Sequence, residues 1–268
     1  MRAEDWWRYD GRRAVVTGCA SGIGAQLAGQ LHELGAEVIG LDLHRPRIGL
    51  DRFVELDLAD PASIDRAAAA LDGPVHALFN VAGVSSGIGD PLRVVCIDFL
   101  GTRQLTEAVL PLMPPGSAVA SVSSLAAAGY LEHRREAAGL LATDSYWAGI
   151  DWCRAHPESL ADGGYRLAKE ALILYTMARA GALAAAGIRI NCTGPGVCET
   201  PILDQLRGRY GPDYLDGIDK PLGRVSDPAE QAAVLTFLNS RAAGYITGQV
   251  IWVDGGNIAG RVAASLQE

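Results

Sequence analysis

The sequence has no run of lysine and arginine residues, and acidic side chains outnumber basic ones. Its 268 residues include 31 aspartates and glutamates against 23 lysines and arginines, a formal net charge of −8 at pH 7. A surface that binds DNA or RNA must neutralise phosphates with clustered basic side chains. The sequence therefore gives no support to nucleic acid as a partner.

Long hydrophobic runs are missing as well. Residues 1–10 contain acidic side chains and two tryptophans, without the apolar core of a secretory signal. The longest uncharged stretch, Ala108–Leu131, contains three prolines and two glycines, which makes it a poor membrane span. We expect a cytoplasmic protein that does not contact membranes.

Cysteine pairs and metal-ligand clusters are also lacking. The five cysteines are an odd number with no Cys-X-X-Cys pair, and the five histidines form no cluster with them. This pattern predicts reduced thiols, mostly in the core, rather than disulfides, and it predicts no metal site.

What is present is a large apolar fraction in a regular pattern. Hydrophobic residues make up 49% of the chain, enough for a sizeable buried core. Short β-branched runs, several of them apolar nearly throughout, predict strands that are covered on both faces. The predicted strands are Arg13–Thr17, Glu37–Asp42, Phe53–Leu56, Val75–Asn80, Ser117–Val122, Ile188–Thr193 and Gln249–Val253.

Longer amphipathic segments separate these strands. The predicted helices include Ile23–Leu34, Leu92–Leu112, Tyr165–Ala186 and one that begins at Asp227-Pro228. Alternating strands and helices indicate a Rossmann-type, doubly wound α/β fold with about seven parallel strands and helices on both faces. No linker, repeat or low-complexity tract divides the chain, so we expect residues 1–268 to form a single domain.

One segment does not follow this alternation. Residues 125–164 contain no predicted strand, and stretches of this length are usually functional or inserted subdomains. We therefore expect a helical insertion here. Within it, Trp147 and Trp152 are expected in the core or at a subunit interface, and His133 and His156 in solvent.

The glycine-rich stretch Thr17-Gly-Cys-Ala-Ser-Gly-Ile-Gly24 follows the first predicted strand and opens the first helix. Gly18, Gly22 and Gly24 would let the backbone approach a phosphate, which the free N–H groups and dipole of the helix N-terminus attract. A glycine pattern alone is often only a turn, but this strand–turn–helix context is that of dinucleotide binding. We expect a dinucleotide cofactor here.

Asp42 ends the second predicted strand, 18 residues after Gly24. An acid at that point accepts hydrogen bonds from the ribose 2′-hydroxyl of NAD and repels the 2′-phosphate of NADP, although it can also be an ordinary solvated strand end. Arg45 and Arg47 lie nearby and would suit a phosphate. No basic residue stands directly after Asp42 or at Cys19, so the sequence favours NAD over NADP.

Tyr165 and Lys169 are four residues apart and therefore share one face of a predicted helix. Tyrosine has a pKa of about 10, and a neighbouring ammonium group lowers that pKa toward the range of a useful acid or base. The spacing alone is common, since Tyr130 and Tyr175 each have an arginine in the same place. Neither of those begins a helix after a strand, so only the Tyr165–Lys169 pair is a candidate for proton exchange with an alcohol or carbonyl.

Six motifs follow one another along the chain: Thr17–Gly24, Asn80-Val-Ala-Gly83, Ser123-Ser124, Tyr165 with Lys169, Pro195-Gly196 and Val253-Asp-Gly-Gly256. Together they resemble the short-chain dehydrogenase/reductase family. The resemblance extends from about Gly11 to Gly256, nearly the whole chain. Each motif is weak alone, but their common order makes the joint signal strong.

The resemblance implies an NAD site built from several segments. The residues that hold the pyrophosphate and adjoining ribose are Gly18, Ser21, Gly22, Ile23 and Gly24. Those that contact the adenosine are Asp42 at the ribose and Asp57 and Leu58 at the adenine. Those that line the cofactor and steady the sheet are Asn80, Ala82 and Gly83, and those that orient the nicotinamide are Pro195, Gly196, Val197 and Thr200.

The resemblance also implies the catalytic residues. Ser124, rather than Ser123, would hydrogen-bond the substrate oxygen. Tyr165 would be the acid/base, while Lys169 would bind the nicotinamide ribose and lower the tyrosine pKa. Asp98 stands where the family commonly has an asparagine that holds a water in a proton relay, and an aspartate there adds charge near Lys169.

Three further features narrow the resemblance from the whole family to one subgroup. Ser124 and Tyr165 are 41 positions apart, more than is usual in the family. This insertion, with Gly18-Cys-Ala20 and Glu199-Thr-Pro201, resembles a subgroup that contains bacterial 3α-hydroxysteroid dehydrogenase/carbonyl reductase and coniferyl-alcohol dehydrogenase. Residues 202–224, with several glycines, are expected to form a mobile lid over the substrate.

The leading hypothesis is an NAD-dependent alcohol dehydrogenase/carbonyl reductase. Its substrate would be a hydrophobic secondary alcohol, steroid-like or cyclic, or an aromatic allylic alcohol, or the corresponding ketone or aldehyde. An epimerase or dehydratase on the same scaffold, and a dinucleotide-binding regulator without turnover, stay open at this stage. Analogy with the family suggests a homodimer or homotetramer.

Overall fold

The computed structural model describes residues 2–47, 49–211 and 217–266. Its strands are β1 (Arg13–Thr17), β2 (Glu37–Asp42), β3 (Arg52–Glu55), β4 (Ala77–Asn80), β5 (Ala118–Val122), β6 (Arg189–Pro195) and β7 (Val250–Val253). They form one parallel sheet in the order β3-β2-β1-β4-β5-β6-β7. This confirms the predicted Rossmann-type fold, and β1 and β2 have the predicted bounds.

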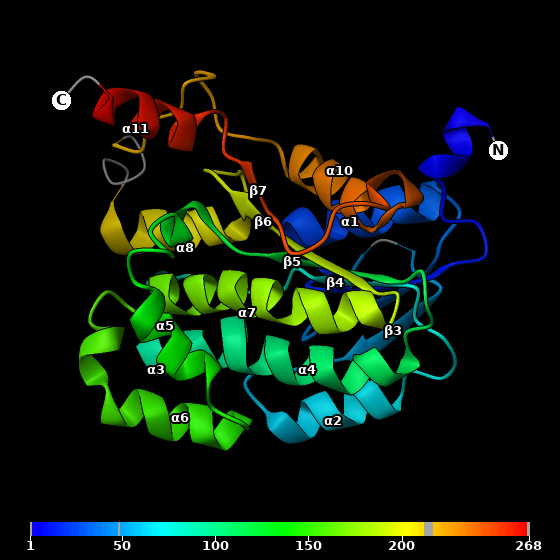
Figure 1. Cartoon of the computed structure of the whole chain (residues 1–268), viewed down its shortest axis with the longest axis horizontal. Coiled ribbons are helices and arrows are strands. Elements are labelled where there is room, and N and C mark those ends of the chain that lie inside the picture. Colours follow the sequence, from blue (N-terminus) through cyan, green and yellow to red (C-terminus); the bar gives the residue numbers. More distant parts are fainter. Residues whose placement is uncertain (1, 48, 212–216, 267–268) are drawn as a thin grey trace.

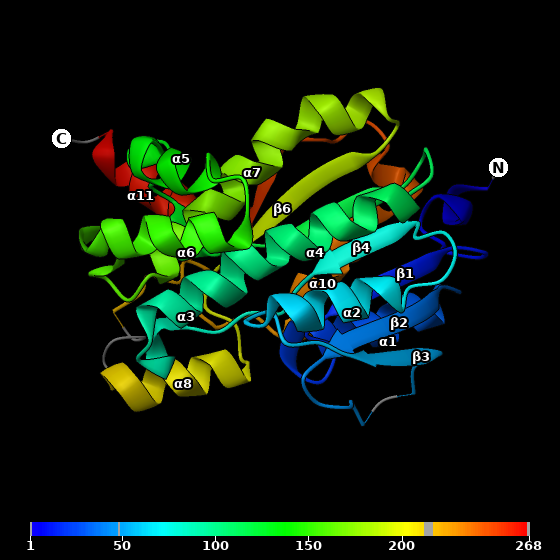
Figure 2. The ribbon, with the colours of Figure 1, turned by 90° about the horizontal axis from the view of Figure 1, so that it is seen from below.

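Helices cover both faces of this sheet. They are α1 (Gly22–Glu33), α2 (Pro61–Ala69), α3 (Pro91–Val95), α4 (Thr102–Val109), α5 (Arg134–Leu141), α6 (Tyr146–Ala155), α7 (Tyr165–Ala185), α8 (Pro201–Tyr210), α10 (Pro228–Asn239) and α11 (Asn257–Ser265). Helices α1 and α10 pack together on one face (Figure 1). Helices α2, α4 and α7 cover the other face, which Figure 2 shows from that side.

The strands are apolar because each of their faces meets a helical layer. Neighbouring residues of a strand point to opposite faces, and in β1 both Val15 and Val16 are fully buried. Val15 belongs to the same core as Leu105 of α4. Val16 belongs to the core that includes Leu27 of α1 and Leu235 of α10. The two layers therefore fix the sheet between them and leave its carboxyl edge for the site.

The predicted helix Leu92–Leu112 is not one regular helix. A π-helical segment, Cys96–Gly101, lies between α3 and α4. Within it, Gly101 passes so close to the backbone after β3 that a Cβ atom there would lie 2.2 Å from the carbonyl oxygen of Leu58. Wider π turns recur at functional sites, and this one contains the buried Asp98.

The insertion, residues 125–164, forms α5 and α6 with short 3₁₀ turns. Helix α5 packs against α7, and α6 packs against the π-helical segment. Trp152 stacks on His156 with ring centroids 4.3 Å apart, whereas Trp147 is 64% exposed and outside the core of this chain. His133 is not simply solvated as expected, because its Nδ1 lies 2.7 Å from the buried carboxylate of Glu170.

The cysteines agree with their prediction as core thiols. All five are free and buried. Burial raises the pKa of the Cys19, Cys153 and Cys192 thiols to about 12. Within the described ranges, no group of three or more His, Cys, Asp or Glu side chains could hold a metal ion, and no helix is long and apolar enough to cross a membrane.

Candidate functional site

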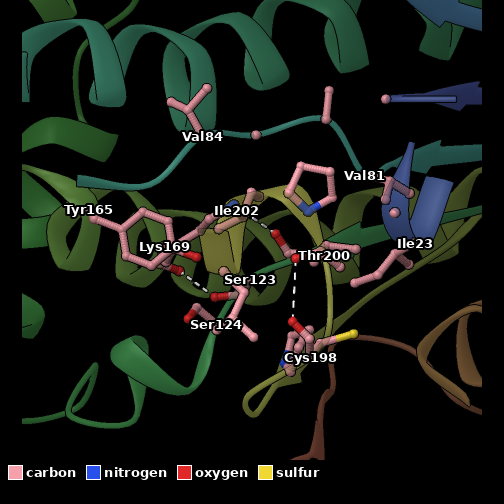
Figure 3. Close-up of a pocket in the computed structure, with 18 of the residues that line it drawn as sticks. Ile23, Val81, Val84, Ser123, Ser124, Tyr165, Lys169, Cys198, Thr200 and Ile202 are labelled. Carbon is pink, nitrogen blue, oxygen red and sulfur yellow. Dashed lines mark hydrogen bonds between the residues drawn. The ribbon is translucent and has the colours of Figure 1, made fainter. Parts of the chain in front are cut away.

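A cavity of about 560 Å³ lies at the carboxyl ends of the strands. Segments that follow β1, β2, β3, β4, β5 and β6 contribute to its wall, together with α7 and α8. It therefore extends across the point where the strand order changes direction, between β1 and β4, which is where ligands bind in open parallel sheets. Most of the predicted site residues line it, and Figure 3 shows part of the group.

The glycine-rich turn has the close packing that its sequence predicted. Gly18 has a φ of +71°, and a Cβ atom there would lie 2.8 Å from the Cα atom of Ala82. A Cβ atom at Gly24 would lie 2.1 Å from the carbonyl oxygen of Gly18. Only glycine fits either position, so the turn folds tightly and the N-terminus of α1 faces the cavity.

Asp42 lines the cavity at the end of β2. Its Oδ2 accepts a hydrogen bond from the Ala20 N–H at 2.9 Å, and its Oδ1 accepts one from the His44 N–H at 3.0 Å. These two bonds fix the carboxylate. Cys19 is fully buried instead of facing the cavity, and Arg45 lies over the Phe53 ring, 5.9 Å from its centroid.

Asp57 and Leu58 also line the cavity, whereas Asn80 does not. The Asn80 amide is buried and donates hydrogen bonds to Thr106 Oγ1 at 2.9 Å and Ser121 Oγ at 3.1 Å. Asn80 therefore joins β4 to α4 and β5. Of the two parts of its expected role, the structure places it where it can steady the sheet and not where it can line the cofactor.

Ser124, Tyr165 and Lys169 come together on one side of the cavity (Figure 3). Ser124 follows β5, and α7 begins at Tyr165. Lys169 Nζ lies 5.6 Å from the centroid of the Tyr165 ring. No residue of α5 or α6 lines the cavity, and the 41 positions between Ser124 and Tyr165 do not separate these two residues in space.

The two neighbouring serines have different surroundings. Ser123 is buried, and its Oγ donates a hydrogen bond to the carbonyl oxygen of Lys169 at 2.8 Å. Ser124 is half-buried, and its Oγ accepts only a 3.2 Å bond from the Ala126 N–H among the described residues. A hydroxyl in that position can still donate to a ligand, which agrees with the choice of Ser124 over Ser123.

Asp98 is buried and does not line the cavity, but it contacts Lys169. Its Oδ2 lies 3.3 Å from Lys169 Nζ, and its Oδ1 accepts a hydrogen bond from the Val84 N–H at 2.9 Å. Burial raises the pKa of Asp98 above its ordinary value. Burial acts to lower the pKa of Lys169, but the Asp98 carboxylate and Tyr165 together outweigh it and the pKa of Lys169 is raised.

The loop after β6 closes the cavity beside the glycine-rich turn. A Cβ atom at Gly22 would lie 3.3 Å from Thr200 Cγ2, and one at Gly196 would lie 2.8 Å from the Cα atom of Asp254. The predicted residues Pro195, Gly196, Val197 and Thr200 all line the cavity. The Pro-Gly and Asp-Gly-Gly motifs are therefore in direct contact.

Several lining residues were missed by the sequence analysis. They include Val84 and, from α11, Arg261, whereas Ile202 and Leu206 belong to the predicted lid. None belongs to a recognisable motif, and only the fold brings α11 to the cavity. The first half of the predicted lid, 202–224, is α8 and lines the cavity, whereas its residues 212–216 lie outside the described residues.

These features fit a nicotinamide dinucleotide. The close packing of the turn after β1 admits only glycine at Gly18 and Gly24, so the N-terminus of α1 is held at the cavity, and the free N–H groups of a helix N-terminus favour a pyrophosphate. Asp42 offers a fixed carboxylate at the end of β2, three strands away from β5, which leads to Ser124. The Tyr165–Lys169 pair lies at the other side of the same cavity.

Comparison with known proteins agrees with this geometry. Residues 151–257 match the family model described as "Enoyl-(Acyl carrier protein) reductase", and residues 14–146 match the "NAD dependent epimerase/dehydratase family". The chain is 35% identical to coniferyl-alcohol dehydrogenase of Pseudomonas sp. strain HR199, over 91% of this chain and 96% of that one. The chain belongs to the short-chain dehydrogenase/reductase family.

Two other relatives support the predicted subgroup. This short-chain dehydrogenase/reductase is 33% identical to the 3-alpha-hydroxysteroid dehydrogenase/carbonyl reductase of Comamonas testosteroni, over 90% of this chain and 95% of that one. The crystal structure of 3-alpha-hydroxysteroid dehydrogenase from Pseudomonas sp. B-0831 complexed with NADH has a TM-score of 0.82 and 31% identity, covering 94% of this chain and 98% of that one. The protein is thus an oxidoreductase that binds a nicotinamide dinucleotide and acts on a small molecule.

Proposed function

We propose that the protein is an NAD-dependent alcohol dehydrogenase/carbonyl reductase. The observation that supports this most directly is one cavity in which Ser124, Tyr165 and Lys169 converge and which Asp42 also lines, at the end of a strand three places away from β5. An alcohol oxidised there needs a proton acceptor, a partner for its oxygen and a hydride acceptor. The first two are side chains of this chain, and the third is the nicotinamide.

Tyr165 is the proposed acid/base. In the oxidative direction its phenolate takes the hydroxyl proton, and Ser124 donates a hydrogen bond that holds the substrate oxygen in place. Lys169 lies beside the Tyr165 ring, where its positive charge favours the phenolate. The bound nicotinamide supplies the hydride chemistry. In the reductive direction Tyr165 returns the proton while Ser124 polarises the carbonyl.

NAD is the proposed cofactor because of Asp42. Its carboxylate lines the cavity and has no ion pair with any described arginine or lysine. A 2′-phosphate at that place would meet a negative charge, whereas a 2′-hydroxyl would find a hydrogen-bond acceptor. The turn has an uncharged cysteine, Cys19, where a basic residue could offset the charge of a 2′-phosphate, and its thiol is buried in the core.

The proposed substrate is a hydrophobic secondary alcohol or an aromatic allylic alcohol. Val84, Ile202 and Leu206 are apolar residues in the wall of the cavity, which suits a bulky hydrocarbon. The relatives named for coniferyl alcohol and for 3-alpha-hydroxysteroids suggest these two classes. We also propose a homo-oligomer by analogy with the family.

An alcohol panel tests the proposal. An androstane 3α-alcohol, coniferyl alcohol, cyclohexanol and a plain aliphatic alcohol are each assayed with NAD and with NADP for formation of the reduced cofactor. Turnover with NAD on one bulky class is the expected result. Cofactor binding without turnover of any alcohol or ketone would contradict the proposal and favour a regulator. Product formation without net change in cofactor oxidation state would favour an epimerase or dehydratase.

A further inference from the structure

The buried ion pair between Asp98 and Lys169 connects the π-helical segment to α7 directly behind the cavity. The Oδ2 and Nζ atoms are 3.3 Å apart, and the two side chains are 0% and 5% exposed. Each partner is also held by backbone. Val84 N–H donates to Asp98 Oδ1 at 2.9 Å, and Lys169 Nζ donates to the carbonyl oxygen of Val122 at 3.1 Å. The pair therefore has a fixed geometry.

Gly83 leaves the space that the pair occupies. A Cβ atom at Gly83 would lie 3.2 Å from Asp98 Oδ1 and also 3.2 Å from Lys169 Nζ. Any other residue at this position would push against both charged groups at once. Because Gly83 has no side chain, the Asp98 carboxylate and the Lys169 ammonium can lie next to each other at the wall of the cavity.

The charges around Lys169 make Asp98 its main partner. From its own helix, Lys169 faces Tyr165, whose ring centroid is 5.6 Å away. The next residue, Glu170, is paired instead with His133 and Arg166. β5 and the loop after it present the neutral Val122 carbonyl, Ser123 and Ser124. Among the described residues, the only ion pair of Lys169 is with Asp98, and Asp98 Oδ2 meets no other hydrogen-bond donor.

We propose that Asp98 is a positioning residue that holds the Lys169 ammonium and offsets part of its charge, so that Tyr165 loses its proton at a higher pH than it would beside an unpaired lysine. The physical reason is that two charges in a buried site interact strongly, because little water screens them. A Lys169 ammonium that is paired with a carboxylate stabilises the Tyr165 phenolate less than an unpaired ammonium would. The carboxylate is also a second negative charge near that phenolate.

The inference rests on the proposed function, since it concerns the acid/base of that site. The inference predicts the direction in which the pH dependence of the two reaction rates moves when the Asp98 carboxylate is removed. Oxidation requires unprotonated Tyr165, and reduction requires protonated Tyr165. In Asp98→Asn, the pH at which the oxidation rate rises and the pH at which the reduction rate falls should therefore both be lower by about one unit. Asp98→Glu, which keeps the charge, should leave the profile closer to that of the parent enzyme.

Glu107→Gln is the matched control. Glu107 of α4 pairs with Arg179 of α7 at 2.8 Å, so the substitution also removes a carboxylate that is paired with a basic side chain of α7, but outside the cavity. It should leave the pH profile unchanged. A merely structural role for Asp98 would lower the rate at every pH without moving the profile.

A second measurement needs no substrate. The near-ultraviolet absorbance of phenolate is titrated in the parent protein and in Asp98→Asn and Asp98→Ser, and the titration of the matching Tyr165→Phe double variant is subtracted from each. A Tyr165 midpoint about one pH unit lower without the Asp98 carboxylate supports the inference. An unchanged or higher midpoint would overturn it, whether or not any alcohol is turned over. Failure of the alcohol panel with a shifted midpoint would count against the proposed function alone.

Discussion

Asp42 is the residue for which sequence and geometry can be compared most directly. Its position at the end of β2 followed from the strand pattern, but its fixed direction did not, because the bonds from the Ala20 and His44 N–H groups depend on how two turns fold together. The burial of Cys19 agrees with the general prediction of core thiols, but its packing against Gly40 depends on how β2 lies beside the turn.

Replacing Asp42 with alanine should weaken NAD binding by about tenfold and reduce the discrimination against NADP, because the hydrogen-bond acceptor and the negative charge are both lost. Dissociation constants for both cofactors, measured by isothermal titration calorimetry, check this. Glu55→Ala is the control, since Glu55 is the register partner of Asp42 on β3 but is exposed and does not line the cavity. An unchanged NAD/NADP preference in Asp42→Ala would remove Asp42 from the ribose site.

Tyr165→Phe should lower hydride transfer at least about a hundredfold while cofactor affinity stays within about twofold, because only the hydroxyl that exchanges the proton is removed. Stopped-flow absorbance of the reduced cofactor measures the first quantity and calorimetry the second. Tyr175→Phe lies on the same helix, with its hydroxyl bonded to Glu107, and should keep full activity. Normal turnover by Tyr165→Phe would refute the proposed mechanism.

Among the elements, strands and regular helices were more predictable than the segments that depend on distant contacts. Buried strands have apolar sequences whatever lies beside them, so β1 and β2 could be placed to the residue. The π-helical segment could not, because it reflects the approach of Gly101 to the Leu58 carbonyl. The contact of His133 with Glu170 similarly requires α5 to pack on α7.

Helix α1 offers a matched pair of glycines. Gly24→Ala would place a Cβ atom 2.1 Å from the Gly18 carbonyl oxygen, whereas nothing lies within 4 Å of a Cβ atom at Gly29. Gly24→Ala should therefore destabilise the protein by about 1–3 kcal/mol and impair cofactor binding. Gly29→Ala should stabilise it by about 0.5–1 kcal/mol.

Urea unfolding midpoints and cofactor titrations measure both effects. If Gly24→Ala bound NAD as tightly as the parent protein, the turn after β1 would not be a phosphate site. A destabilised Gly29→Ala would show instead that α1 tolerates no substitution on that side.

At the scale of the whole molecule, the cavity is assembled from segments between Gly18 and Arg261, so a ligand there contacts nearly the full length of the chain. The sequence could predict which motifs meet, because parallel strands bring their carboxyl ends to one edge. It placed residues 202–224 over the substrate, and α8 does line the cavity, but it could not predict the approach of α11, which has no motif.

Such a ligand should stabilise the entire fold. NAD at a hundred times its dissociation constant should add about 2.7 kcal/mol to the free energy of unfolding and raise the melting temperature by about 5–10 °C. Differential scanning calorimetry over a range of NAD concentrations measures the shift, with NADP as the comparison. An equal or larger shift with NADP would contradict the proposed cofactor preference.

The five buried thiols can also report on the local opening of the segments that surround them. A thiol with a raised pKa inside the core reacts slowly with an alkylating reagent, so modification has to wait for the surrounding segment to open. Cys19 lies in the glycine-rich turn, Cys153 in the insertion and Cys192 in the central sheet. Cys198 lines the cavity itself. Mass spectrometry of the modified peptides would thus rank the opening of four regions in one experiment, without any introduced label.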